Sequence, residues 1–120
     1  MNKINHFNEH KKVRIASPKR HFLKHEVTKL ICCMFVLDKL KADKVYTEFK
    51  IGERKADVYF EIKSEKYAIE VQNKWDLKYQ ELAETYYLNR DITPVVIPLK
   101  DIPDSLEEIW SKLFDYFSVD

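Results

Sequence analysis

The chain has 120 residues, 45% of them hydrophobic and 34% charged, which predicts one soluble globular domain with a core of its own. Its formal net charge of +1 excludes a chain-wide attraction to nucleic acid, and a single glycine, Gly52, excludes the glycine-rich phosphate loops of dinucleotide folds. The N-terminus is polar and no apolar run reaches the roughly 18 residues of a membrane span, so we expect a cytoplasmic protein with no membrane partner.

Residues 1–16 show no sustained hydrophobic period and are rich in Lys, Arg and His. We therefore predict a basic N-terminal arm over 1–16 and a single α/β domain over 17–120. The whole stretch 1–30 is basic and contains every histidine of the chain. Such a segment suits contacts with phosphates, and a solvated basic tail is the alternative.

Ser17-Pro18 is a typical helix start, with an N-cap hydroxyl followed by proline in the first turn. Apolar residues continue at helical spacing to about Leu40, which predicts a long and largely buried helix. Glu26 projects from this apolar stripe, where a carboxylate needs a partner. We interpret Glu26 either as a stripe-edge residue that pairs with a lysine or reaches water, or as a functional carboxylate delivered to a sheet.

Three alternating runs follow, Lys44–Ile51, Lys55–Lys63 and Lys66–Gln72, and they predict a β-meander. They are separated by Gly52-Glu53 and Ser64-Glu65, which we take as two-residue hairpin loops. Residue 51 then pairs with 54, and 63 with 66. This register gathers an apolar set on one face: Val45, Thr47, Phe49, Val58, Phe60, Ile62, Tyr67, Ile69 and Val71.

The opposite face of the predicted meander receives Tyr46, Glu48, Asp57, Tyr59, Glu61, Ala68, Glu70 and Gln72. The register sets Asp57 directly opposite both Glu48 and Gln72, with Glu70 as its diagonal neighbour. Two carboxylates at that separation can converge on one cation, and the Val71 carbonyl lies between them in the sequence. A change of one residue in either loop would flip a strand and separate these groups.

The rest of the chain predicts a helix from Asp76 as N-cap to about Asn89, and then a short buried strand, Thr93–Ile97. Pro103-Asp104-Ser105 opens a last amphipathic helix. The predicted order is α-β-β-β-α-β-α. We therefore expect an α/β fold, with a mixed β-sheet and flanking helices.

The stretch with Ala56-Asp57-Val58, a hairpin and then Ile69-Glu70-Val71-Gln72-Asn73 resembles the core motif of the PD-(D/E)xK, or restriction-endonuclease-like, nuclease superfamily. The resemblance covers roughly Ser17 to Ile97, because the preceding helix and the following helix and strand match the order of that fold. Within the superfamily the motif is reminiscent of CoiA-like competence proteins. It is also similar to the replication-relaxation family of mobile elements.

The resemblance implies that Asp57 and Glu70 bind Mg²⁺ or Mn²⁺ and that Glu26 is an accessory carboxylate. Gln72 stands at the position where the family motif has a lysine. That lysine orients the nucleophile or stabilises developing charge, which an uncharged glutamine cannot do. By resemblance, the activity expected is hydrolysis of DNA phosphodiesters by a metal-activated water.

Ala56 departs from the proline that normally precedes the aspartate of the motif, and Lys74 or Lys78 could supply the cation missing at Gln72. The expected catalytic set is Asp57, Glu70, Gln72, Glu26 and Lys74. Contacts to the DNA backbone are expected from Lys74, Lys78, Arg54, Lys19 and Arg20.

Because Gln72 carries no charge, the sequence leaves open whether this chain is an enzyme. The first alternative is a catalytically inactive nuclease-fold DNA-binding accessory protein, of the kind used in mobile-element replication or transfer. The second alternative is a protein-interaction module, for example a homodimer that uses exposed tyrosines and the acidic C-terminal helix.

Overall fold

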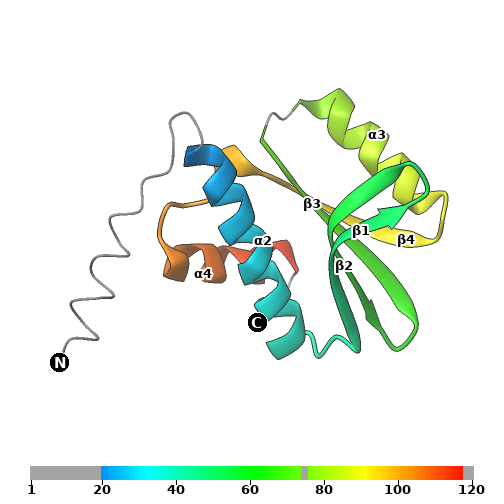
Figure 1. Cartoon of the computed structure of the whole chain (residues 1–120), viewed down its shortest axis with the longest axis horizontal. Helices are drawn as coiled ribbons and strands as arrows, with labels where there is room; N and C mark the ends of the chain where they lie inside the picture. The colour runs from blue at the N-terminus through cyan, green and yellow to red at the C-terminus, as the bar shows by residue number, and fades with distance from the viewer. Residues whose placement is uncertain (1–19, 74–75, 118–120) are drawn as a thin grey trace.

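The computed structural model describes residues 20–73 and 76–117 as a mixed sheet with helices packed against it (Figure 1). The predicted order of helices and strands is confirmed, with one short 3₁₀ turn added before the last helix. The predicted basic arm over 1–16 lies outside the described residues. The elements are α2 (Arg20–Asp38), β1 (Lys44–Ile51), β2 (Arg54–Ile62), β3 (Glu65–Gln72), α3 (Leu77–Leu88), β4 (Ile92–Pro98), η1 (Leu99–Asp101) and α4 (Leu106–Tyr116).

The four strands lie in the order β1-β2-β3-β4. The first three form the expected antiparallel meander, and β4 runs parallel to β3 after the crossover through α3. Asp76 and Ser105 cap α3 and α4, because each side chain accepts a hydrogen bond from a backbone N–H of the first turn. The mixed sheet predicted from the sequence is therefore confirmed.

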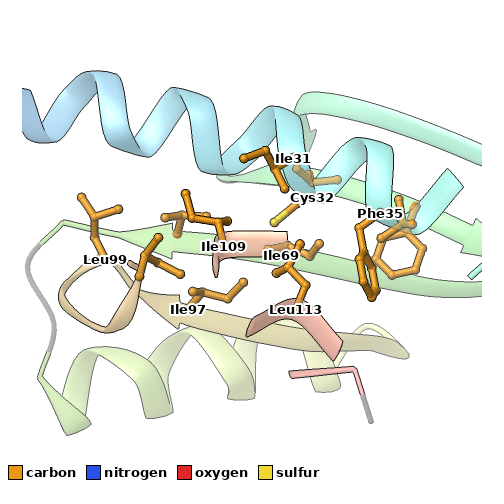
Figure 2. Close-up of a cluster of buried hydrophobic side chains, with 13 residues drawn as sticks. Ile31, Cys32, Phe35, Ile69, Ile97, Leu99, Ile109 and Leu113 are labelled. Atoms are coloured by element: carbon orange, nitrogen blue, oxygen red, sulfur yellow. The ribbon is translucent and has the colours of Figure 1, made fainter. Parts of the chain in front are cut away.

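The larger hydrophobic cluster lies between the sheet and the helices α2 and α4. Figure 2 shows Ile31, Cys32 and Phe35 of α2 packed against Ile69 and Ile97 of the sheet. Fully burying a side chain of this size stabilises the fold by roughly 1.5–3 kcal/mol. A smaller cluster on the other face packs under α3: Ala56, Tyr59, Ala68, Tyr87 and Ile92. The two clusters give three layers, with the sheet in the middle.

Helix α2 is buried along one side only, so the prediction of a largely buried helix is wrong for its other side. Its sheet-facing side chains are buried, among them Cys32, Phe35 and Val36. Its outer side exposes Leu23, Leu30, Met34 and Leu37. The apolar period located the helix, but it ran round more of the helix surface than the sheet and α4 cover.

The turn between β2 and β3 lies one residue earlier than predicted. Ile62 pairs with Glu65, and Lys63 and Ser64 form the loop with φ angles of 50° and 71°. The Asp43 carboxylate accepts a hydrogen bond of 2.7 Å from the Lys63 backbone N–H, which favours the turn at this place. The pairing of β2 with β3 therefore shifts by two residues, which leaves every β3 side chain on its predicted face.

The turn between β1 and β2 is the predicted one, since Ile51 pairs with Arg54. Phe49 nevertheless lies on the face opposite to the predicted one, where its ring stacks on Tyr59 with centroids 4.3 Å apart. The reason is Glu48, whose φ of 52° interrupts the alternation of side chains along β1. This kink turns Phe49 toward α3.

Candidate active site where strands β2 and β3 diverge

The strands β2 and β3 separate at the two acids of the motif. Their pairing ends at Val58 and Ile69. One step further it would join Asp57 to Glu70, so the prediction that Asp57 lies opposite Gln72 is wrong by two residues. In place of a ladder bond, Asp57 Oδ2 accepts a hydrogen bond of 2.7 Å from the Val71 backbone N–H. Beyond this point β3 remains paired with β4.

An open pocket of about 490 Å³ lies at this divergence. It brings together the predicted residues Asp57, Glu70 and Gln72 with groups from α2 and α3. The residues that line it are His25, Lys55, Asp57, Glu70, Val71, Gln72, Asn73 and Tyr79. The two predicted metal ligands therefore face one common space.

His25 of α2 holds Asp57 from the side of that helix. Its Nε2 lies 3.3 Å from Asp57 Oδ2, and its Nδ1 lies 3.0 Å from Glu26 Oε2. The hydrogen bond to Asp57, more than that to Glu26, raises the pKa of His25 to about 9, against the lowering effect of burial. The ring is therefore protonated at neutral pH and donates to both acids. A signal for His25 was its helical spacing to the buried Lys29 and Cys32.

Glu26 is paired with a lysine, as the first of its two interpretations proposed. Lys29 Nζ donates to both Glu26 oxygens at 3.0 and 3.1 Å, which lowers the pKa of the Glu26 carboxyl. The same ammonium lies 3.1 Å from Glu48 Oε1. Burial lowers the pKa of Lys29, but its hydrogen bonds to Glu26 and Glu48 raise it above the ordinary value. Glu26 does not line the pocket itself.

Glu70 is held from the side of α3. Arg54 donates from Nε to Glu70 Oε2 at 2.6 Å and from Nη2 to Oε1 at 3.1 Å, and the Tyr87 hydroxyl donates to Oε2 at 2.5 Å. The guanidinium lies 5.4 Å from the ring centroid of Tyr79 and 6.0 Å from that of Tyr87. The hydrogen bonds with Glu70 raise the pKa of Arg54, which is therefore a cation here. Arg54, predicted to contact DNA, is thus bound to a motif acid.

Gln72 is buried at the pocket wall, with 6% of its surface exposed. Among the described residues its Nε2 and Oε1 have no hydrogen-bond partner. A buried polar group without a partner costs about 1–3 kcal/mol. Gln72 therefore carries an amide at the pocket wall that a polar group would satisfy once it reaches it.

The lysines and arginines predicted to contact DNA do not gather at the pocket in the described part of the chain. Lys19 and Lys74 lie outside the described residues, as does the side chain of Arg20. Lys78 is exposed in the first turn of α3 and is not part of the pocket wall. Among the described residues, the lysine that lines the pocket is Lys55, which is absent from the predicted site residues. A signal for it was its place two residues before Asp57 in the same strand.

The oxygen donors at the pocket suit a hard divalent cation. Within 20–73 and 76–117 no three or more His, Cys, Asp or Glu side chains are grouped so as to hold a metal. The residues that line the pocket instead include two carboxylates, Asp57 and Glu70, and Gln72, whose amide is buried. Carboxylate and amide oxygens are the ligands of Mg²⁺ and Mn²⁺, so the donors fit once His25 and Arg54 release the acids.

Comparison with protein-family models, with curated proteins and with solved structures finds no match for this chain. Among the helices of the described part of the chain, none has the length and apolar character to cross a membrane. The activity of this chain is therefore inferred from the geometry of the pocket.

Proposed function

We propose that this chain is a metal-dependent, nuclease-like domain that hydrolyses DNA phosphodiesters at the pocket between β2 and β3. One observation carries the proposal. Asp57 and Glu70, supplied by two strands that diverge at these residues, line one open pocket with the partnerless amide of Gln72. The element order and the mixed sheet support the resemblance to the PD-(D/E)xK superfamily.

Asp57 and Glu70 would hold Mg²⁺ or Mn²⁺, which supplies polarisation of the phosphoryl group and a lowered pKa of bound water. The protein orients both acids beforehand. The Val71 N–H fixes Asp57, and the Tyr87 hydroxyl fixes Glu70. Neither donor competes with a cation by charge, so both can stay in place when the acids bind one.

Arg54 and His25 have a different role, because both are cations bound to these acids. A divalent ion bound to the two carboxylates replaces Arg54 and His25 as their partner. Each of these two side chains can then bind a DNA phosphate in the same region. Arg54 suits this exchange, since its guanidinium forms bidentate bonds with phosphate as it does with carboxylate. The competition also predicts that the acids bind metal more weakly than two unpaired carboxylates would.

Cleavage of supercoiled plasmid DNA in Mg²⁺ or Mn²⁺, compared with EDTA, tests the proposal. We expect Asp57→Asn and Glu70→Gln to lower cleavage by at least about 10²-fold, the scale for loss of a transition-state electrostatic contact. Glu61→Gln is the matched control, because this β2 acid bonds Tyr59 and lies away from the pocket. Absence of cleavage by the unaltered protein, or equal cleavage by all variants, would reject hydrolysis at this site.

The second candidate is a DNA-binding accessory protein that does not cut DNA. It is favoured by Gln72 at the lysine position and by the Arg54 pair that occupies Glu70. It predicts duplex binding in EDTA, no cleavage in Mn²⁺, and no loss of binding in Asp57→Asn. Absence of DNA binding at low salt would reject both candidate functions and leave the protein-interaction module. That alternative is tested by measuring whether the chain forms a homodimer in solution.

A further inference from the structure

Glu48 has a backbone conformation that its sequence position does not explain. Its φ of 52° lies in the left-handed region, where a residue with a side chain is strained. Strand β1 pairs with β2 on both sides of it, at Thr47 with Val58 and at Phe49 with Ala56. The strain is therefore confined to one residue inside a paired strand, which indicates that its side chain is held by other contacts.

Two lysines hold the Glu48 carboxylate. Lys29 Nζ lies 3.1 Å from Oε1 and Lys55 Nζ lies 3.6 Å from Oε2. The Lys29 side chain is only 6% exposed, and a buried ammonium is costly unless carboxylates surround it. Glu26 and Glu48 provide those carboxylates. Helix α2 thus fixes Glu48, and Glu48 in turn pairs with Lys55.

Lys55 extends from this anchor to the pocket. Its side chain is 58% exposed and lines the pocket with Asp57, Glu70 and Gln72. Its pairing with Glu48 at 3.6 Å is loose, so its ammonium retains donors for a second anion. Arg54, the neighbouring cation, is engaged by Glu70 through two hydrogen bonds. Lys55 is therefore the pocket cation that is ready to receive a phosphate without first leaving a motif acid.

Building on the proposed function, we propose that Lys55 contacts the phosphate to be cleaved and supplies the positive charge that Gln72 lacks. Its ammonium would donate hydrogen bonds to a non-bridging oxygen and take part in no bond that forms or breaks. Glu48 and Lys29 are positioning residues, which act on the phosphate only through Lys55. The strained backbone of Glu48 is then the structural cost of holding the lysine at this pocket.

Binding of duplex DNA in EDTA, measured over a range of salt concentrations, tests the phosphate contact without any cleavage. We expect Lys55→Gln to reduce the slope of log K against log salt by about 0.9, the value for one lost phosphate contact. Lys55→Arg keeps the slope. Lys44→Gln is the matched control, since this exposed lysine lies at the other end of the same hairpin, opposite Glu61. An unchanged slope in Lys55→Gln would overturn the proposal.

Cleavage in Mn²⁺ tests the catalytic part. We expect Lys55→Gln to lower kcat by about 10²-fold, with recovery in Lys55→Arg. As a single substitution, Glu48→Gln should lower kcat. In the Lys55→Gln background it should lower kcat no further, because Glu48 and Lys55 act as one unit. A merely structural Glu48 would give additive losses.

The two proposals fail in different ways. If the unaltered protein cuts DNA, Asp57→Asn does not, and Lys55→Gln cuts normally, the role of Lys55 is overturned and the proposed function stands. If the unaltered protein does not cut DNA, the proposed function fails, and the salt slope alone decides whether Lys55 binds phosphate. If no DNA binds at low salt, both are overturned.

Discussion

At the scale of single residues, the site is built from charges that neutralise one another. His25 forms ion pairs with Asp57 and Glu26, and Lys29 forms ion pairs with Glu26 and Glu48. Breaking a buried pair on one side leaves an uncompensated charge, which costs more than the pair itself contributes. Each of these residues therefore constrains its neighbours.

The left-handed backbone at Glu48 predicts that glycine is tolerated there better than alanine. Glu48→Ala and Glu48→Gly both lose the pair with Lys29, but only glycine also removes the steric cost. We expect Glu48→Gly to be about 1 kcal/mol more stable than Glu48→Ala in urea unfolding. At Thr47, which is not left-handed, the order should reverse, with alanine the more stable by about 0.5–1 kcal/mol. The same order at both positions would contradict the assignment of strain.

The raised pKa of His25 predicts a pH-dependent contribution to stability in EDTA. Because its pKa rises from 6.5 in the unfolded chain to about 9 in the fold, the folded state binds the proton more tightly. The stabilisation is complete below pH 6.5 and is lost as the pH rises through about 9. The difference in unfolding free energy between the unaltered protein and His25→Gln should therefore shrink over this range. A constant difference would show that Asp57 and Glu26 do not retain the proton on His25.

At the scale of elements, Tyr86 joins the first hairpin to α3. Its hydroxyl donates to the Ile51 carbonyl at 2.5 Å and accepts from the Glu53 N–H at 3.1 Å. Gly52 lies between these two residues with φ 63°, and a Cβ at this position would meet the Tyr86 hydroxyl. The turn thus needs glycine both for its backbone and for the approach of the tyrosine. Through it, Arg54 is set at the start of β2, where it reaches Glu70.

This arrangement predicts coupling between Gly52 and Tyr86. We expect Gly52→Ala to cost more than about 1 kcal/mol, from the left-handed backbone and from the contact with the hydroxyl. The cost should be smaller in a Tyr86→Phe background, where the hydroxyl is absent and the backbone cost alone remains. A double-mutant cycle of unfolding free energies measures the difference. Strict additivity would contradict the close approach seen here.

Several features of these elements could be predicted from the sequence, because side-chain alternation depends on parity alone. Asp57 and Glu70 line one pocket even though the second turn lies one residue earlier than expected. The shift of two residues keeps Glu70 on its predicted face, toward Tyr87 of α3, whereas Asp57 contacts His25 of α2. The turn position itself depends on a contact from Asp43, distant in the sequence, which no local pattern reports. The kink at Glu48 could not be predicted either, because no local pattern indicates its positive φ or its pair with Lys29 on another element.

At the scale of the whole molecule, alternating charges run from α2 across the first hairpin to the pocket. The chain of contacts passes from Asp57 through His25, Glu26, Lys29 and Glu48 to Lys55. Periodicity located the faces of the elements, but it could not show which cation would meet which acid across elements. Because Asp57 and Glu70 are already paired with His25 and Arg54, a divalent cation must displace these two side chains to bind the acids.

If a metal ion replaces Arg54 at Glu70, then a metal ion should restore stability to a variant that lacks Arg54. In EDTA, Arg54→Gln should lower stability by about 3–5 kcal/mol, because Glu70 is left buried without its cation. Mn²⁺ should then raise the melting temperature of Arg54→Gln more than that of the unaltered protein, since Glu70 is free to bind it. Lys50→Gln, at an exposed lysine of β1, serves as the control. An equal or smaller Mn²⁺ effect in Arg54→Gln would show that Glu70 does not bind the metal.

Calorimetric titration with Mn²⁺ tests most directly the claim that Asp57 and Glu70 act as one cation site. We expect Mn²⁺ to bind the unaltered protein and Glu61→Gln alike, and binding to be lost in both Asp57→Asn and Glu70→Gln. No binding by the unaltered protein, or binding that survives either substitution, would show that the two acids do not form one cation site.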